Sequence, residues 1–191
     1  MTRRLLLSFL ASALACAPAR LEPATAPEAA TVVIVVRHAE KALLPANDPP
    51  LTEAGVVRAK ALAAALAEDN VQVVISTPLV RALETARPTA EARGLAIETV
   101  LLSPAVVDHA KAVADAVRRH AGKTVLVVGH SNTVAAIIRE LGGPKMPDLC
   151  DSQYSNLFIL VLDGVGTRFI RGTYGAATVD PGPGCANQIL R

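Results

Sequence analysis

The sequence predicts an α/β domain with three layers, in which helices cover both faces of a mostly parallel central sheet. Two observations support this fold class. Continuous apolar runs rich in β-branched residues, such as 31–36 (TVVIVV) and 123–129 (KTVLVVG), are typical of strands that are buried on both faces. These runs alternate with segments of helical periodicity, which indicates parallel β-α-β units.

Turn and capping residues divide the chain into its expected elements. Thr52 is placed to cap one helix, and Thr77, followed by Pro78, is placed to cap the next. Pro88 should kink or restart that second helix, and Gly94 should end it. The expected order is strand 31–36, helix 53–69, strand 71–76, helix 78–93, strand 95–102, helix 108–122, strand 123–129, helix 131–143 and strands 156–163 and 167–174.

The amino-terminal residues differ in composition from the rest. Residues 1–15 combine a basic start, a short apolar run and small residues at its end, as a signal peptide does. Residues 16–30 are rich in Pro and Ala and are expected to form a tether, which leaves residues 31–191 as the folded domain. Cleavage before Cys16 would place a cysteine where bacterial lipoproteins carry their lipid. We therefore expect an exported protein, either periplasmic or membrane-anchored; a non-cleaved apolar anchor is the alternative.

The composition limits the core and the partners. Hydrophobic residues make up 51% of the chain, but aromatic residues only 3%, so the core must consist of Ala, Val, Leu and Ile. The net charge is +2, and two arginines lie in the predicted signal peptide. The mature chain is therefore close to neutral, and without a basic run or aromatic platform it is not expected to bind nucleic acid.

Three cysteines are present: Cys16, Cys150 and Cys185. If Cys16 carries lipid, Cys150 and Cys185 remain as a pair. In an oxidising compartment they would form a disulfide that ties the C-terminal tail to the domain. Two unpaired thiols are the alternative.

Charged side chains follow three of the buried strands. Arg37 and His38 come directly after the first strand, Arg81 lies one helical turn beyond the second, and His130 follows strand 123–129. Because ligands bind at the carboxyl ends of parallel strands, these four side chains should meet at one edge of the sheet. Two guanidinium groups can bind a tetrahedral dianion, and fixed positive charge can stabilise a phosphoryl group in transfer.

The histidines suggest how this site would react. A neutral imidazole among cations has a lowered pKa and stays nucleophilic near neutral pH. We therefore expect His38 to attack phosphorus and form a phosphoramidate that water cleaves, while His130 donates to the phosphoryl oxygens. No metal ligand cluster or cofactor motif is present, so neither a metal nor a cofactor is expected.

Three motifs in this order resemble the histidine phosphatase superfamily, in its phosphoglycerate-mutase-like branch. They are VVRHAEK with PLTEAGVVRAKALA after it, STPLVRALETA, and VLVVGHSNT, and the resemblance covers roughly residues 31–175. It implies a metal-independent phosphoric monoester hydrolase with His38 as nucleophile. It also implies that Arg37, Arg81 and His130 bind the phosphate. The substrate would be a small-molecule or peptide phosphate ester.

The general acid is the least defined part of the predicted site. Family members that cleave phosphate esters usually supply a carboxylic acid from the segment after the second helix. Asp108 is the nearest candidate here and Glu98 the other, although Asp108 also fits the N-cap of the next helix. Glu40 is expected to pair with Lys41 or with the loop.

Two other functions are compatible with the sequence. A tethered domain of the same fold would bind a phosphorylated ligand with weak or no catalysis. A serine hydrolase would use Ser131, because GHSNT resembles a nucleophile elbow, but Thr133 stands where that elbow needs a small residue.

Several polar residues near the motifs are predicted to be structural. We expect Asn132 to supply an amide at a helix start, Thr85 a buried hydroxyl, and His109 and His120 a solvated helix face. Specificity is expected in residues 42–50 and 144–156. Their few charges disfavour a highly anionic substrate.

Overall fold

A computed structural model describes residues 29–178 of the chain. The predicted signal peptide, nearly all of the predicted tether, Cys16 and Cys185 lie outside the described residues. Across residues 29–178, no helix has both the length and the apolar character needed to cross a membrane.

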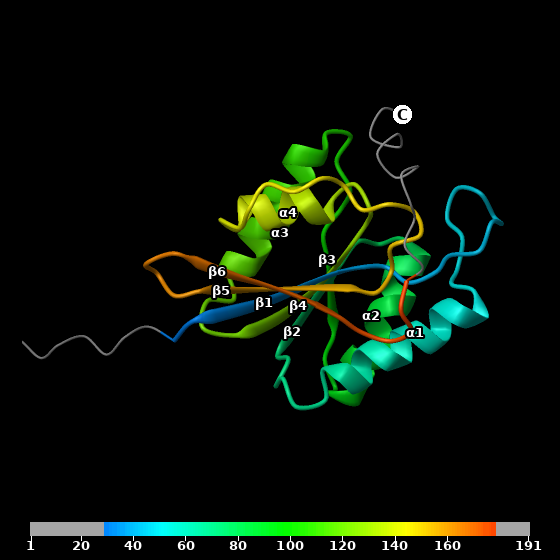
Figure 1. Cartoon of the computed structure of the whole chain (residues 1–191), viewed down its shortest axis with the longest axis horizontal. Coiled ribbons are helices and arrows are strands. Elements are labelled where there is room, and N and C mark those ends of the chain that lie inside the picture. Colours follow the sequence, from blue (N-terminus) through cyan, green and yellow to red (C-terminus); the bar gives the residue numbers. More distant parts are fainter. Residues whose placement is uncertain (1–28, 179–191) are drawn as a thin grey trace, which may run out of the picture.

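The centre of the domain is a six-stranded sheet with the strand order β3-β2-β4-β1-β5-β6 (Figure 1). The first four strands in this order are parallel to one another, whereas β5 pairs antiparallel with both β1 and β6. The predicted α/β class with a mostly parallel sheet is therefore confirmed. The strands are β1 Thr31–Arg37, β2 Val73–Ser76, β3 Ile97–Thr99, β4 Thr124–Gly129, β5 Asn156–Leu162 and β6 Thr167–Thr173.

Four helices cover the sheet on its two faces. The helices α1 and α2 contact each other on one face, and α3 and α4 contact each other on the opposite face (Figure 1). This arrangement gives the three layers that the alternation of patterns predicts. The helices are α1 Glu53–Ala65, α2 Val80–Ala92, α3 Val106–Arg118 and α4 Val134–Glu140.

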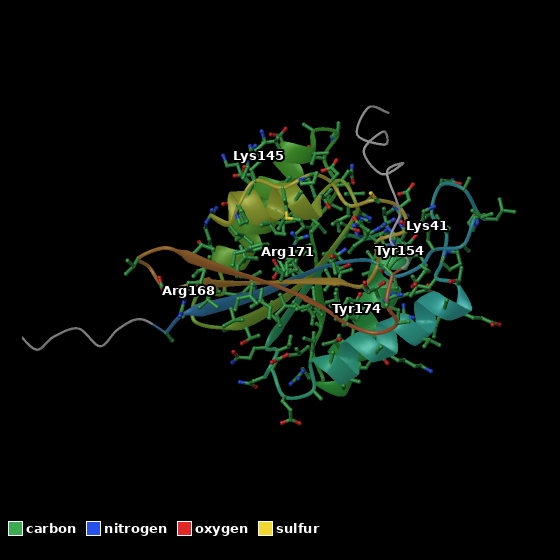
Figure 2. All side chains as sticks on the ribbon, viewed as in Figure 1. Lys41, Lys145, Tyr154, Arg168, Arg171 and Tyr174 are labelled. Atoms are coloured by element: carbon green, nitrogen blue, oxygen red, sulfur yellow. The ribbon has the colours of Figure 1, made fainter. Side chains whose placement is uncertain are left out.

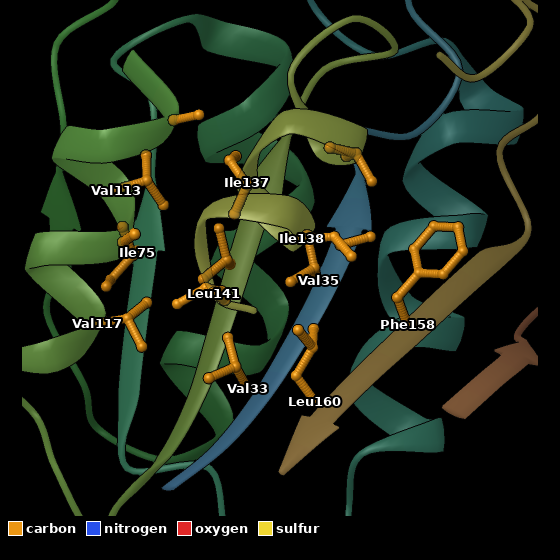
Figure 3. Packing of buried hydrophobic residues seen from close by; sticks show 14 of the residues in the cluster. Val33, Val35, Ile75, Val113, Val117, Ile137, Ile138, Leu141, Phe158 and Leu160 are labelled. Carbon is orange, nitrogen blue, oxygen red and sulfur yellow. The ribbon is translucent and has the colours of Figure 1, made fainter. Parts of the chain in front are cut away.

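The central strand β1 contributes to both hydrophobic cores. Val33 and Val35 pack with residues of α3 and α4 (Figure 3), whereas Ile34 and Val36 pack with residues of α1 and α2. Alternate side chains of a strand point to opposite faces, and here both faces are covered. This explains why β1 is a continuous apolar run with no polar alternation.

The start of α1 agrees with the sequence. Thr52 is its N-cap, and the Thr52 hydroxyl accepts a hydrogen bond from the Gly55 backbone N–H. A Cβ at Gly55 would lie 2.2 Å from the Glu40 carbonyl oxygen. A side chain at this position would therefore push α1 away from the loop that follows β1.

The start of α2 differs from the prediction. The helix begins at Val80 with Leu79 at the N-cap, and no side chain caps it. Thr77 is therefore not the cap; its hydroxyl lies 2.9 Å from His130 Nε2 instead. Pro88 lies inside a helix that continues to Ala92, so it neither ends nor restarts α2. Gly94 follows the helix with a φ of 62°, as expected of a residue that ends one.

The region around β3 and α3 also differs in its bounds. The predicted strand 95–102 contains only three residues of regular strand, Ile97–Thr99. The helix α3 begins at Val106 with Ala105 at the N-cap position, so Asp108 lies in its first turn and is not the cap.

An ion pair joins the loop after β1 to α1. Arg58 Nη2 lies 2.7 Å from Glu40 Oε1, and Arg58 Nε also donates to both carboxylate oxygens. Arg58 is buried and donates further to the carbonyls of Tyr174 and Ala176. The Glu40 carboxylate thus pairs with Arg58 of α1 and not, as predicted from the sequence, with Lys41 or the loop, because the chain turns so that α1 lies beside Glu40.

We predict that Arg58→Ala lowers the free energy of unfolding by about 3 kcal/mol, because Glu40 would remain mostly buried without its partner. Chemical denaturation followed by circular dichroism measures this change. The matched control is Arg118→Ala, whose pair with Asp115 is half exposed, and which should change stability by less than about 1 kcal/mol. Equal effects of the two substitutions would contradict the prediction.

Candidate active site

The pairing of β1 with β4 brings the predicted site together. Arg37 is opposite Gly129 in the parallel ladder, and the His38 N–H donates to the Gly129 carbonyl at 2.9 Å. His38 and His130 therefore leave the sheet side by side, with ring centroids 5.3 Å apart. Together with Arg37 and Arg81 they line a cavity of about 330 Å³ at the carboxyl ends of the parallel strands.

A backbone contact sets the tautomer of His38. Its Nδ1 lies 2.8 Å from the Ala39 carbonyl, which can only accept, so Nδ1 carries the hydrogen and Nε2 keeps its lone pair. Burial, together with the charges of Arg37 and Arg81, lowers the pKa of His38 from its ordinary 6.5 to about 3. The imidazole is therefore neutral at pH 7.

Arg81 approaches His38 from the first turn of α2. Its Nε donates to His38 Nε2 at 3.3 Å, and its Nη1 lies 3.6 Å from Asp48 Oδ1. Thr85 fixes this turn, because its buried hydroxyl donates to the Arg81 carbonyl and accepts from the Ala39 N–H. Thr85 is thus a buried structural hydroxyl, as expected from the sequence.

Arg37 is almost fully buried by the segment that precedes β5. Its Nη1 donates to the Cys150 carbonyl at 2.6 Å and to the Gln153 carbonyl at 3.4 Å. Its Cζ lies 4.2 Å from the centroid of the Tyr154 ring, and Asp151 Oδ1 lies 3.5 Å from Nη2. Figure 2 shows Tyr154 and Lys41 near the end of β1. The sequence did not indicate this role for residues 150–154.

Cys150 itself is disulfide-bonded. The alternative of a free thiol at this position is therefore wrong. The predicted partner, Cys185, lies outside the described residues, and the pairing of Cys150 with Cys185 stays a prediction.

His130 is held by two threonines. The Thr77 hydroxyl lies 2.9 Å from His130 Nε2, and the Thr133 hydroxyl accepts from the His130 N–H at 2.9 Å. Burial and the charge of Arg81 lower the pKa of His130 to about 3. Ser131 also lines the cavity, but among the described contacts its hydroxyl makes no hydrogen bond to a histidine. This geometry does not support a Ser131 nucleophile.

The structure does not bring the predicted acids into the cavity. Asp108 is exposed on α3 and is not among the cavity-lining residues. Glu98 lies 2.6 Å from Arg119 and 2.8 Å from His120, away from the site. Among the described residues that line the cavity, Asp151 is the only carboxylate, and it faces Arg37.

Two residues expected to be structural line the cavity instead. His109 is 1% exposed and not part of a solvated face. Its Nδ1 lies 3.0 Å from the Leu101 carbonyl, and its Nε2 is buried without a partner. Asn132 also lines the cavity, whereas Thr133 occupies the N-cap position of α4. His120 is partly buried against Glu98.

A larger hollow of about 430 Å³ lies at the other end of the sheet, where β1 and β6 begin and β5 ends. Its lining includes Thr31, Arg118 and Thr167 but no histidine. The smaller cavity is the better candidate for an active site because both histidines and both arginines line it.

The family comparison covers the first two of the three sequence motifs, whereas VLVVGHSNT with His130 lies beyond the matched residues. The model of the histidine phosphatase superfamily (branch 1) matches residues 33–101, which include Arg37, His38 and Arg81. A comparison with curated protein sequences finds no match.

Solved structures of low sequence identity share the fold. The protein histidine phosphatase SixA, complexed with tungstate, superposes with a TM-score of 0.60 and 22% identity, covering 74% of this chain and 96% of its own. A mycobacterial glucosyl-3-phosphoglycerate phosphatase superposes with a TM-score of 0.57 and 18% sequence identity, and the match covers 78% of this chain and 100% of that one. A phosphoserine phosphatase from Entamoeba histolytica, in complex with 3-phosphoglyceric acid, has a TM-score of 0.57 and 15% sequence identity. The match covers 77% of this chain and 98% of that one. The resemblance to phosphoglycerate-mutase-like histidine phosphatases is confirmed.

We predict that the two cavity histidines make the domain less stable in acid. In the unfolded chain they take up protons near pH 6.5, whereas in the folded chain they stay neutral to about pH 3. Stability is therefore lost as the pH falls from 6.5 towards 3, by about 1.4 kcal/mol per pH unit for each histidine.

Urea denaturation at pH 7, 6 and 5 tests this, with the double variant His38→Gln/His130→Gln as the control. The unfolding free energy of the native chain relative to this variant should fall by roughly 1.4 kcal/mol from pH 7 to 6 and by roughly 2.4 kcal/mol from pH 6 to 5, since both unfolded histidines are only partly protonated above pH 6. Parallel pH profiles for the two proteins would refute the assignment.

Proposed function

We propose that this protein of the histidine phosphatase superfamily is a metal-independent phosphatase that transfers a phosphoryl group from a phosphate monoester to His38 and then to water. The observation that supports this most directly is the state of His38. The imidazole is neutral, its Nδ1 is engaged with the Ala39 carbonyl, and its Nε2 faces Arg81. Nucleophile and phosphate-binding cation thus share one small cavity.

In the first step the phosphoryl group replaces the contacts that the arginines make in the structure. Arg81 would exchange Asp48 and His38 Nε2 for phosphoryl oxygens, which frees the Nε2 lone pair. Nε2 then attacks phosphorus, the bond from phosphorus to the ester oxygen breaks, and the ester oxygen takes that electron pair and a proton from water, so that the alcohol leaves. The two guanidiniums stabilise the charge on the phosphoryl oxygens.

In the second step water cleaves the phosphohistidine. The water oxygen attacks phosphorus, the N–P bond breaks, and Nε2 regains its lone pair. The proton that the attacking water loses goes to solvent. Inorganic phosphate leaves, and Arg81 returns to His38. The fixed orientation of the ring, with Nδ1 on the Ala39 carbonyl, keeps the same nitrogen in place for both steps.

The similar structures support this class of reaction. Two of them are named as phosphatases of phosphorylated small molecules and one as a protein histidine phosphatase. We propose for this chain the activity these names share, the removal of a phosphoryl group. The alternative is a domain that binds a phosphorylated ligand with little or no turnover.

We predict that His38→Ala lowers phosphatase activity to less than a few per cent while the domain stays folded, because the substitution removes the proposed nucleophile, the Nε2 that faces Arg81. Release of inorganic phosphate and circular dichroism measure the two properties. Activity of the native protein should survive EDTA, since the arginines supply the positive charge. A folded His38→Ala variant with substantial activity would remove His38 as the nucleophile. An inactive native protein that still binds phosphate would favour the binding domain.

We predict that Asp108→Asn changes the rates with p-nitrophenyl phosphate and with an alkyl phosphate by less than about threefold, because Asp108 does not line the cavity. Loss of a general acid would lower the alkyl phosphate rate by roughly 10²–10⁴-fold and spare the aryl ester. Steady-state kinetics with both substrates decides between these outcomes. A selective loss with the alkyl ester would identify Asp108 as the acid.

A further inference from the structure

One part of the cavity wall is apolar. The connections after β2 and β3, together with the first residue of α3, provide it. Because β3 and β2 lie at one edge of the sheet while β4 and β1 are central, this wall lies to one side of the paired histidines. Its residues, which we call the apolar wall, are Leu79, Leu102, Pro104 and Val106.

The apolar wall is open to solvent. Leu102 is 43% exposed, Pro104 is also exposed, and Leu79 and Val106 are partly exposed. About half of the leucine and valine side chains in residues 29–178 are instead buried in the two large hydrophobic cores. A ligand that covers the apolar wall would therefore remove apolar surface from water, which is favourable in proportion to the area covered.

The apolar wall offers no acid to a leaving group. Its only polar neighbour in this stretch of the cavity lining is Ser103, and the carboxylate of Asp151 faces Arg37. His109 lies close by, but its Nδ1 is engaged with the Leu101 carbonyl and its Nε2 is buried from solvent. The four side chains of the apolar wall therefore supply no proton to an alcohol bound against them.

We propose that the apolar wall binds the leaving group, and that the preferred substrates are phosphate monoesters of apolar phenols. This rests on the proposed phosphatase function. Phenols ionise near pH 10, as the tyrosine side chain does, so a phenolate departs with little help. Nε2 of His38 attacks phosphorus, the P–O bond breaks, the phenolate takes the electron pair and then a proton from water, and a second water cleaves the N–P bond.

Anionic leaving groups fit this cavity less well. Three cations line it among the described residues, and two of them, Arg37 and Arg81, are assigned to the phosphoryl group. The third, Lys41, is exposed and lies on the loop after β1. A carboxylate placed against the apolar wall would lose water against side chains that carry no positive charge.

Phosphonates test the apolar wall without turnover, because their C–P bond is not cleaved by this chemistry. Titration calorimetry with phenylphosphonate, methylphosphonate and phosphonoacetate gives the three dissociation constants. We expect phenylphosphonate to bind at least tenfold more tightly than methylphosphonate, and phosphonoacetate to bind no more tightly than methylphosphonate. Equal binding of the phenyl and methyl compounds, or tighter binding of phosphonoacetate, would overturn the proposal.

A matched pair of variants locates the effect. Leu102→Ser should reduce the ratio of phenylphosphonate to methylphosphonate affinity at least threefold and leave the affinity for inorganic phosphate unchanged. Leu101→Ser is the control, because Leu101 is its neighbour, is 74% exposed and does not line the cavity. Both leucines are exposed, so neither substitution should unfold the domain. The proposal is contradicted if Leu102→Ser leaves the ratio of phenylphosphonate to methylphosphonate affinity unchanged, or if Leu101→Ser lowers this ratio equally.

Turnover separates this proposal from the function on which it rests. We expect a higher kcat/KM with phenyl phosphate than with glycerol 2-phosphate. Comparing the kcat/KM of a phosphotyrosyl peptide with that of phenyl phosphate shows whether the preferred phenol is a free small molecule or part of a protein. Preference for glycerol 2-phosphate would overturn the leaving-group proposal and leave the phosphatase function standing. Selective phenylphosphonate binding without any turnover would instead overturn the phosphatase function.

Discussion

The alignment of two parallel strands determines the site. Because Arg37 of β1 is opposite Gly129 of β4, the next residue of each strand, His38 and His130, emerges at the same level. A slip of one residue in this pairing would turn every side chain of β1 to the other face of the sheet. The side chains of both hydrophobic cores pack only with the present alternation of β1. The packing of both hydrophobic cores thus fixes the distance between the two imidazoles, and the chemistry depends on packing several residues away.

Burial of polar groups at this edge is costly, and the surrounding backbone offsets much of the cost. Arg37 places a cation under the surface, where the carbonyls of Cys150 and Gln153 accept its hydrogens and Tyr154 covers one face. The histidines carry no charge and need fewer contacts. Under the proposed function this edge is preorganised for an anion, because Arg37 is already removed from water and the imidazoles stay neutral beside it.

Patterns local in the chain predicted most of the fold and the four central site residues, because the strand runs and the residues that follow them are contiguous. Contacts between distant segments were not readable in this way. Thr77 has the form of an N-cap, yet a histidine 53 positions away binds its hydroxyl. His109 did have a signal: it falls on the helical face of Val113 and Val117, which is the buried face of α3. Residues 150–154, which hold Arg37, lie in a loop without periodicity, and no sequence pattern indicated their contact with Arg37.

The hold of residues 150–154 on Arg37 spans more than a hundred positions of the chain, since the Arg37 guanidinium and the Cys150 carbonyl are 113 residues apart. During synthesis Arg37 is added early, and residues 150–154, which hold its guanidinium, are added late. A nascent chain that has completed β1, α1 and α2 holds Arg37, His38 and Arg81 but lacks His130 and residues 150–154. The proposed phosphate site is therefore complete only after the last third of the domain has been synthesised.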